Sequence, residues 1–157
     1  LDGSSDEAYG FRVFLHHYCV HLSGPDLDQA MAPFAGDRRA ARGFNGDIAR
    51  HLAGWRGAVG ASSPAELGRR ISRKTLLAVA GLVSVHDNTW TTDRELAGHR
   101  WSVIHPSLRT GLDQLLAWTD GGAPADRDAV GYAVEGTIAT IVEQFAADIG
   151  LWSAPPP

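Results

Sequence analysis

The most apolar stretch of this chain, residues 63–87, reads SPAELGRRISRKTLLAVAGLVSVHD. It opens with helix-start signals, because Ser63 can cap a helix, Pro64 suits the first helical position, and Glu66 can complete a capping box. One mostly apolar face then recurs at three- and four-residue steps, at Leu67, Ile71, Thr75, Ala78, Leu82 and Val85. Neighbouring apolar residues widen this face until little polar surface remains. The stretch therefore predicts a central helix.

Composition indicates one globular domain with a substantial core. The chain has 157 residues, of which 44% are hydrophobic and 20% are charged. Its formal net charge of -4 gives no electrostatic reason to expect a nucleic acid or an anionic membrane as partner. The acidic excess favours a small cationic ligand instead.

The single cysteine bears on the cellular compartment, and the length of the longest apolar run bears on membrane insertion. Cys19 is the only cysteine, so an intrachain disulfide is excluded and a reducing, cytoplasmic compartment is the simpler expectation. The apolar run 75–85 is shorter than the ~20 residues needed to cross a bilayer, so no membrane span is expected.

The rest of the chain predicts further helices joined by short connections. Helix caps and breakers place them at about residues 7–22, 26–31, 37–55, 92–105, 106–120 and 126–149. Asp37 and Asp126 are expected caps, and Thr92 with Glu95 forms a second capping box. Strand-like alternation is absent from the sequence. The pattern predicts an all-α fold, an antiparallel bundle of six to seven helices around a central helix at about 63–87.

One constellation is a weak signal for metal chemistry. His16, His17, Cys19 and His21 lie close in sequence, but no glutamate follows in metalloprotease spacing, so we expect histidines beside an apolar stripe rather than a zinc site. No Gly-rich phosphate loop and no Ser-His-Asp constellation is present in the sequence. We therefore assign no catalytic residue and no metal ligand.

Three stretches of the sequence nevertheless resemble parts of a known domain. Residues 13–27 read VFLHHYCVHLSGPDL, residues 76–106 read LLAVAGLVSVHDNTWTTDRELAGHRWSVIHP, and residues 133–142 read AVEGTIATIV. Together they resemble the C-terminal helical domain of aminoglycoside nucleotidyltransferases of the streptomycin/spectinomycin adenylyltransferase type. The resemblance covers most of the chain and rests on diffuse patterns, such as a helix ending in a Gly-Pro step.

The resemblance implies a substrate-covering domain of an enzyme whose catalytic half lies elsewhere. In that family an N-terminal catalytic domain holds most of the contacts to Mg2+ and ATP, so this chain alone is expected to be inactive. On this interpretation residues 1–6 are a linker from an upstream domain, residues 7–152 are a single helical domain, and residues 153–157 are a flexible tail.

The resemblance also suggests binding residues. Arg94 stands where the family has lysine and Tyr132 lies near a family tyrosine, so both are expected to face the nucleotide. Trp90, Asp87 and Asp93 crowd the turn before Arg94 and could receive a cationic, hydroxyl-bearing acceptor. Simpler roles compete with these: a solvated arginine in a first helical turn, a core or groove tyrosine, and carboxylates that cap helices or turns.

Two other functions stay open. A stand-alone helical binding or dimerisation module would keep the bundle without catalysis. Arg94 and His99 also form an R-x4-H arrangement that resembles the ribonuclease motif of helical HEPN toxins. That motif is short, and a ribonuclease needs the two side chains poised together in a cleft.

Overall fold

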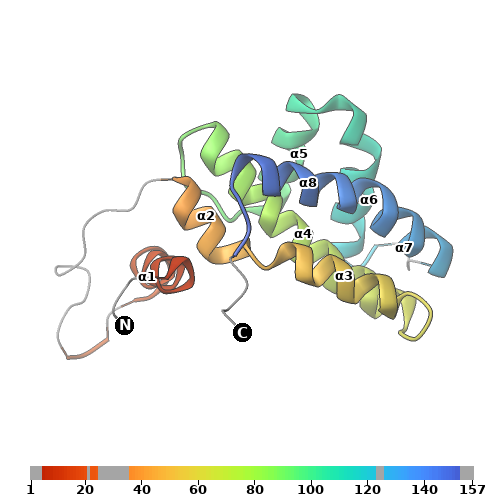
Figure 1. Cartoon of the computed structure of the whole chain (residues 1–157), viewed down its shortest axis with the longest axis horizontal. Coiled ribbons are helices and arrows are strands. Elements are labelled where there is room, and N and C mark those ends of the chain that lie inside the picture. Colours follow the sequence, from red (N-terminus) through yellow and green to blue (C-terminus); the bar gives the residue numbers. More distant parts are fainter. Residues whose placement is uncertain (1–4, 21, 25–35, 123–125, 153–157) are drawn as a thin grey trace.

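A computed structural model of the chain describes residues 5–20, 22–24, 36–122 and 126–152, and this described part is helical without a strand, which confirms the all-α class (Figure 1). The helices follow the chain in the order α1 (Asp6–Tyr18), α2 (Arg38–Asn45), α3 (Ile48–Ala58), α4 (Pro64–His86), α5 (Arg94–Ile104), η2 (Pro106–Leu108), α6 (Arg109–Thr119), α7 (Arg127–Ala133), η3 (Val134–Ile138) and α8 (Ala139–Asp148). The helix expected at 26–31 and the terminal segments 1–4 and 153–157 lie outside the described residues.

Helix α4 is the centre of the bundle, as predicted. It begins at Pro64 and ends at His86, and it contacts α2, α3, α5, α6, α7 and α8. Its N-cap Ser63 makes no side-chain capping hydrogen bond, so the expected capping box is wrong although the start of the helix is right. No helix in the described part of the chain combines the length and the apolar character that a membrane span requires.

The last three elements form one rod across the bundle. Helix α7, the π-helical turn η3 and helix α8 continue into one another, and Asp126 caps the first through the amide of Ala129. Their predicted apolar side chains are buried, at Val130, Val134, Ile138, Ile141, Phe145 and Ile149. The sequence pattern did not indicate the π-helical turn, which adjusts the packing of the rod beside Gly111 of α6.

The helix expected at 37–55 is broken into α2 and α3. Asp37 caps α2 as predicted, through the amide of Ala40, but α2 ends at Asn45. Trp152 packs onto Gly46 and donates its indole N–H to the carbonyl oxygen of Arg42 at 2.7 Å. The same carbonyl also accepts the amide of Gly46 at 2.7 Å, so Trp152 adds a second hydrogen bond at the end of α2.

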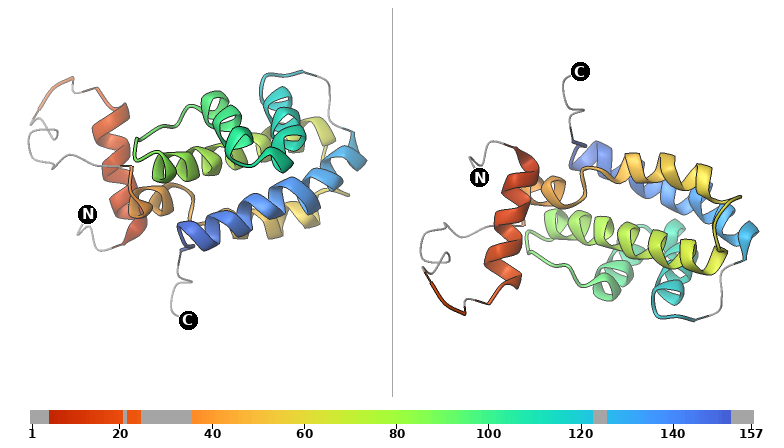
Figure 2. Two further views of the ribbon diagram at one scale, coloured as in Figure 1. Left: turned by 90° about the horizontal axis from the view of Figure 1, so that it is seen from above. Right: turned by 90° about the horizontal axis from the view of Figure 1, so that it is seen from below.

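Helix α1 lies across one end of the bundle, roughly perpendicular to its long axis (Figure 2). The expected end at Leu22 is wrong: α1 ends at Tyr18, and Cys19 is already extended. Val20 and Leu22 are almost fully exposed, so beyond Tyr18 no packing partner supports a further helical turn. Helix α1 buries Ala8 and Val13 against its neighbours and leaves its aromatic residues partly exposed.

Candidate anion-binding site

Arg94 is the first residue of α5, and its side chain reaches α4. The preceding residue Asp93 is the N-cap, accepting a hydrogen bond from the amide of Leu96 at 3.0 Å, so the capping box expected from Thr92 is wrong by one residue. Arg94 Nε donates to the backbone carbonyl of Arg73 at 3.1 Å. The guanidinium is thereby directed toward one face of the central helix.

That face of α4 is a basic groove. The groove encloses about 350 Å³ and is lined by Glu66, Arg69, Arg70, Arg73, Lys74, Leu77 and Arg94. The six α4 residues follow one another at three- and one-residue steps, so they form one stripe along the helix. Five of the seven side chains are cationic and one is acidic, which gives the groove a positive field.

Most of these cations are available to a ligand. Lys74 is the exception, because its ammonium lies 2.8 Å from a carboxylate oxygen of Asp47. Burial acts to raise the pKa of Asp47, but the hydrogen bond and charge of Lys74 hold it below its usual value. Within the described part of the chain, Arg69, Arg70 and Arg73 form no ion pair. Guanidinium groups offer planar forks of donors that match phosphate oxygens, so the groove suits a phosphate-bearing anion.

The two carboxylates predicted to receive a cationic acceptor have internal partners. Asp87 is exposed and accepts two hydrogen bonds from Arg100, each 2.9 Å long, and a third contact from His86 at 2.7 Å. The hydrogen bonds from Arg100 and His86 hold the pKa of Asp87 far below its usual range. Asp93 acts as the helix cap described above. Both residues therefore adopt the simpler structural roles, and acceptor binding by them stays a prediction.

Trp90 also has an internal partner. Its indole N–H donates to the hydroxyl of Tyr18 in α1 at 2.8 Å, and its ring lies 5.1 Å from the ring of Phe44 and 6.2 Å from that of His17. The residue is half-buried rather than free in a polar loop. The structure thus gives this indole the role of connecting the turn before α5 to α1.

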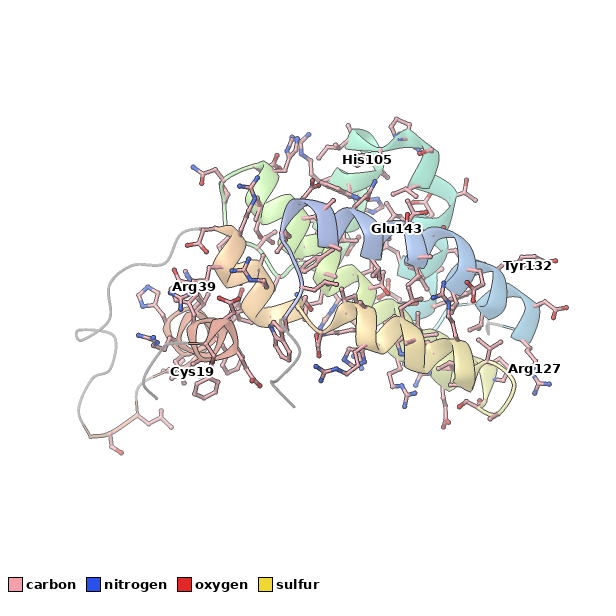
Figure 3. All side chains as sticks on the ribbon, viewed as in Figure 1. Cys19, Arg39, His105, Arg127, Tyr132 and Glu143 are labelled. Carbon is pink, nitrogen blue, oxygen red and sulfur yellow. The ribbon has the colours of Figure 1, made fainter. Side chains whose placement is uncertain are left out.

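Tyr132 lies apart from the groove. It is 82% exposed and lines a separate hollow with residues of α3 and α7, among them Arg56 and Arg127. Figure 3 shows Tyr132 and Arg127 at the end of the molecule opposite Cys19 and Arg39. The two residues predicted to face the nucleotide, Arg94 and Tyr132, are therefore not brought together within this chain.

The remaining motifs do not assemble into a reactive centre. Among the described residues no group of three or more His, Cys, Asp or Glu side chains is placed to hold a metal ion, and His21 lies outside them. Arg94 and His99 are five residues apart on α5, about 140° around the helix axis, and Arg94 is turned toward α4. The geometry that a ribonuclease pair requires is thus not formed by these two residues within one copy of the chain.

Arg69 and Arg70 are groove residues that the sequence analysis missed. A usable signal existed, because residues 66, 69, 70, 73, 74 and 77 share the spacing of one helical stripe, opposite the apolar face of α4. The spacing could not reveal that Arg94 of the next helix approaches this stripe. Its approach makes the stripe one wall of a groove.

Comparisons with known proteins found no match for the chain. No family model, curated protein or solved structure matches it.

Proposed function

We propose that this chain is the helical substrate-covering domain of a nucleotidyltransferase-like protein, and that its basic groove binds the phosphates of ATP. The observation that supports this proposal is the convergence of Arg94 from α5 with Arg69, Arg70 and Arg73 from α4 in one groove. The same residue, Arg94, is the one that the family resemblance assigns to the nucleotide phosphates. Catalysis would need a separate domain, since this chain offers no catalytic set.

The described residues fit the phosphates of Mg-ATP better than the metal ion. Arginines supply N–H donors and charge for phosphate oxygens, whereas no carboxylate cluster is available in the described ranges for Mg2+. In this proposal the magnesium ion is held mainly by the catalytic domain, where it would neutralise the phosphate chain while the nucleotidyl group passes to a hydroxyl group and pyrophosphate leaves. The groove arginines would hold and orient the same phosphate chain from the other side.

The test is calorimetric titration of the chain with ATP, ADP and AMP at low and moderate salt. Affinity is expected to rise with the number of phosphates and to fall with salt, because the contacts are charge-based. Arg94→Ala is expected to weaken ATP binding about tenfold, the loss typical of one charge-assisted hydrogen bond.

Arg127→Ala is the matched control, because it removes an exposed arginine that lines the other hollow. It should leave ATP affinity within about twofold, a difference of less than 0.5 kcal/mol. Equal losses in the two variants, or no ATP binding by the wild-type chain, would contradict the proposal.

A second candidate function, a stand-alone binding or dimerisation module, is favoured by the aromatic stripe of α1. Phe11 and Phe14 are 47% and 42% exposed, and their rings stack at 6.4 Å. Exposed contiguous aromatic surface is typical of protein interaction sites. A dimer in light scattering that Phe14→Ser converts to a monomer would support this function; a wild-type monomer would argue against self-association.

A further inference from the structure

Arg94 follows a loop that the hydrogen bonds between Asp87 and Arg100 tie to α5, and two further attachments hold this loop to α4 and to α1. The loop spans residues 87–93 between α4 and α5. On its inner side the buried hydroxyl of Ser84 accepts a hydrogen bond from the amide of Thr91 at 2.9 Å and donates to the carbonyl of Ala80 at 2.7 Å. This first fastening joins the loop to the helix that precedes it.

The second fastening comes from α1. The hydroxyl of Tyr18 accepts the indole N–H of Trp90 at 2.8 Å and lies 2.8 Å from the hydroxyl of Thr92, with which it forms a second hydrogen bond. One side-chain oxygen thus ties two loop residues to a helix that is distant in sequence. Phe44 and His17 pack against the Trp90 ring and limit its movement.

We infer that Tyr18 is a positioning residue for the basic groove, an inference that rests on the proposed function of that groove. Thr92 stands two residues before Arg94, and the intervening Asp93 caps α5. Fixing Thr92 and Trp90 therefore fixes where α5 begins and the direction from which Arg94 reaches across α4. The Tyr18 hydroxyl touches no groove residue, so it acts on the groove only through this loop.

A second tyrosine on the same helix supplies a matched control. The Tyr9 hydroxyl donates to a carboxylate oxygen of Asp37 at 3.0 Å, which fastens α1 to the start of α2 rather than to the loop. Tyr9→Phe and Tyr18→Phe each remove one hydroxyl from α1 and keep the aromatic ring. If α1 docking alone mattered, the two variants would behave alike; if Tyr18 positions the loop, only one of them would alter the groove.

The experiment compares inorganic tripolyphosphate binding by the wild-type chain and the two variants, together with amide hydrogen exchange. Tyr18→Phe is expected to weaken tripolyphosphate binding about fivefold, the equivalent of one neutral hydrogen bond, and to shift the indole N–H resonance of Trp90. The amides of Thr91 and Leu96 should exchange faster. Tyr9→Phe should leave all three readouts close to wild type.

The outcomes separate this inference from the proposed function. Unchanged affinity and exchange in Tyr18→Phe, or equal losses in both variants, would overturn the positioning role. A wild-type chain that binds no tripolyphosphate would contradict the proposed function, and Tyr18 would then have no ligand site to position. Faster exchange in Tyr18→Phe would then show a loop clamp without a ligand site.

Discussion

Two regions of this molecule are held together by different chemistry. Around α4, helices meet through fully buried apolar side chains, among them Leu76, Leu112 and Phe145. At the other junction α1 crosses α2 where backbone meets backbone, since a Cβ atom on Gly10 would lie 2.7 Å from the carbonyl carbon of Gly43. The helices around α4 leave little water-accessible surface between them, whereas the junction of α1 and α2 depends on the close approach of the two backbones.

Hydrogen bonds and ion pairs complete the junction between α1 and α2. Asp6 accepts hydrogen bonds from Arg39 and Arg42, and Tyr9 donates to Asp37. Partly exposed ion pairs contribute little net free energy, whereas buried apolar surface supplies most of what holds a fold together. We therefore expect α1 to detach under conditions in which the helices around α4 stay folded.

The largest expected effect is the loss of stability caused by a cavity beside α4. Phe145→Ala removes a ring that is 0% exposed and should lower the free energy of unfolding by about 3–5 kcal/mol, as measured by chemical denaturation. Leu96→Ala is the control, because Leu96 is 60% exposed and its truncation should change the free energy by less than about 0.5 kcal/mol. Similar losses in the two variants would show that α4 does not organise the core.

A substitution at the second junction should have a smaller and local effect. Gly10→Ala places a methyl group against the backbone of Gly43, which cannot yield, so α1 must move at a cost of about 1–3 kcal/mol. Amide exchange in α1 should accelerate while amides of α4 keep their protection. Gly54→Ala is the control, since a Cβ there meets nothing within 4 Å and should stabilise α3 slightly. Uniform acceleration throughout the chain would contradict separate junctions.

The smallest expected effect is the pH dependence of α1 docking. Hydrogen bonds from Arg42 and then Arg39, together with their charges, hold the pKa of Asp6 below its usual value. The ion pairs therefore stabilise the docked helix above about pH 4, and this contribution is lost as the pH falls through the lowered pKa. Relative to the intrinsic exchange rate at each pH, the protection of α1 amides should fall in that acidic window, and Asp6→Asn should abolish this loss of protection. An unchanged acid response in Asp6→Asn would show that other groups control docking.

The same difference between the junctions explains how much of the fold was predictable. Apolar periodicity located α4 and the rod from α7 to α8, because burial of apolar residues leaves a pattern in the sequence. It gave the wrong end for α1, whose aromatic residues stay partly exposed, and it extended one helix through Gly46, where α2 ends. Trp152 packs against Gly46, and local sequence carries no signal for a contact between residues more than a hundred positions apart.

The candidate site was also predictable only in part. Arg94 was predicted from a resemblance, and the spacing of Arg69, Arg70 and Arg73 could have been recognised as a helical stripe. Their convergence into a groove could not, because it depends on how α5 packs against α4. Ligand binding by Trp90 stays a prediction, and the partner that the sequence did not indicate is Tyr18, a contact formed only when α1 packs on the bundle.

The most direct test of the central claim is to map ATP onto the chain by amide chemical-shift perturbation. We expect the largest shifts to cluster on one face of α4, from Glu66 to Leu77, and at the start of α5 around Arg94. In Arg94→Ala the same cluster should need about tenfold more ATP to reach half of its full shift. Shifts centred on Tyr132 and Gly131, or spread evenly over exposed cations, would contradict the assignment of the basic groove as the phosphate-binding site.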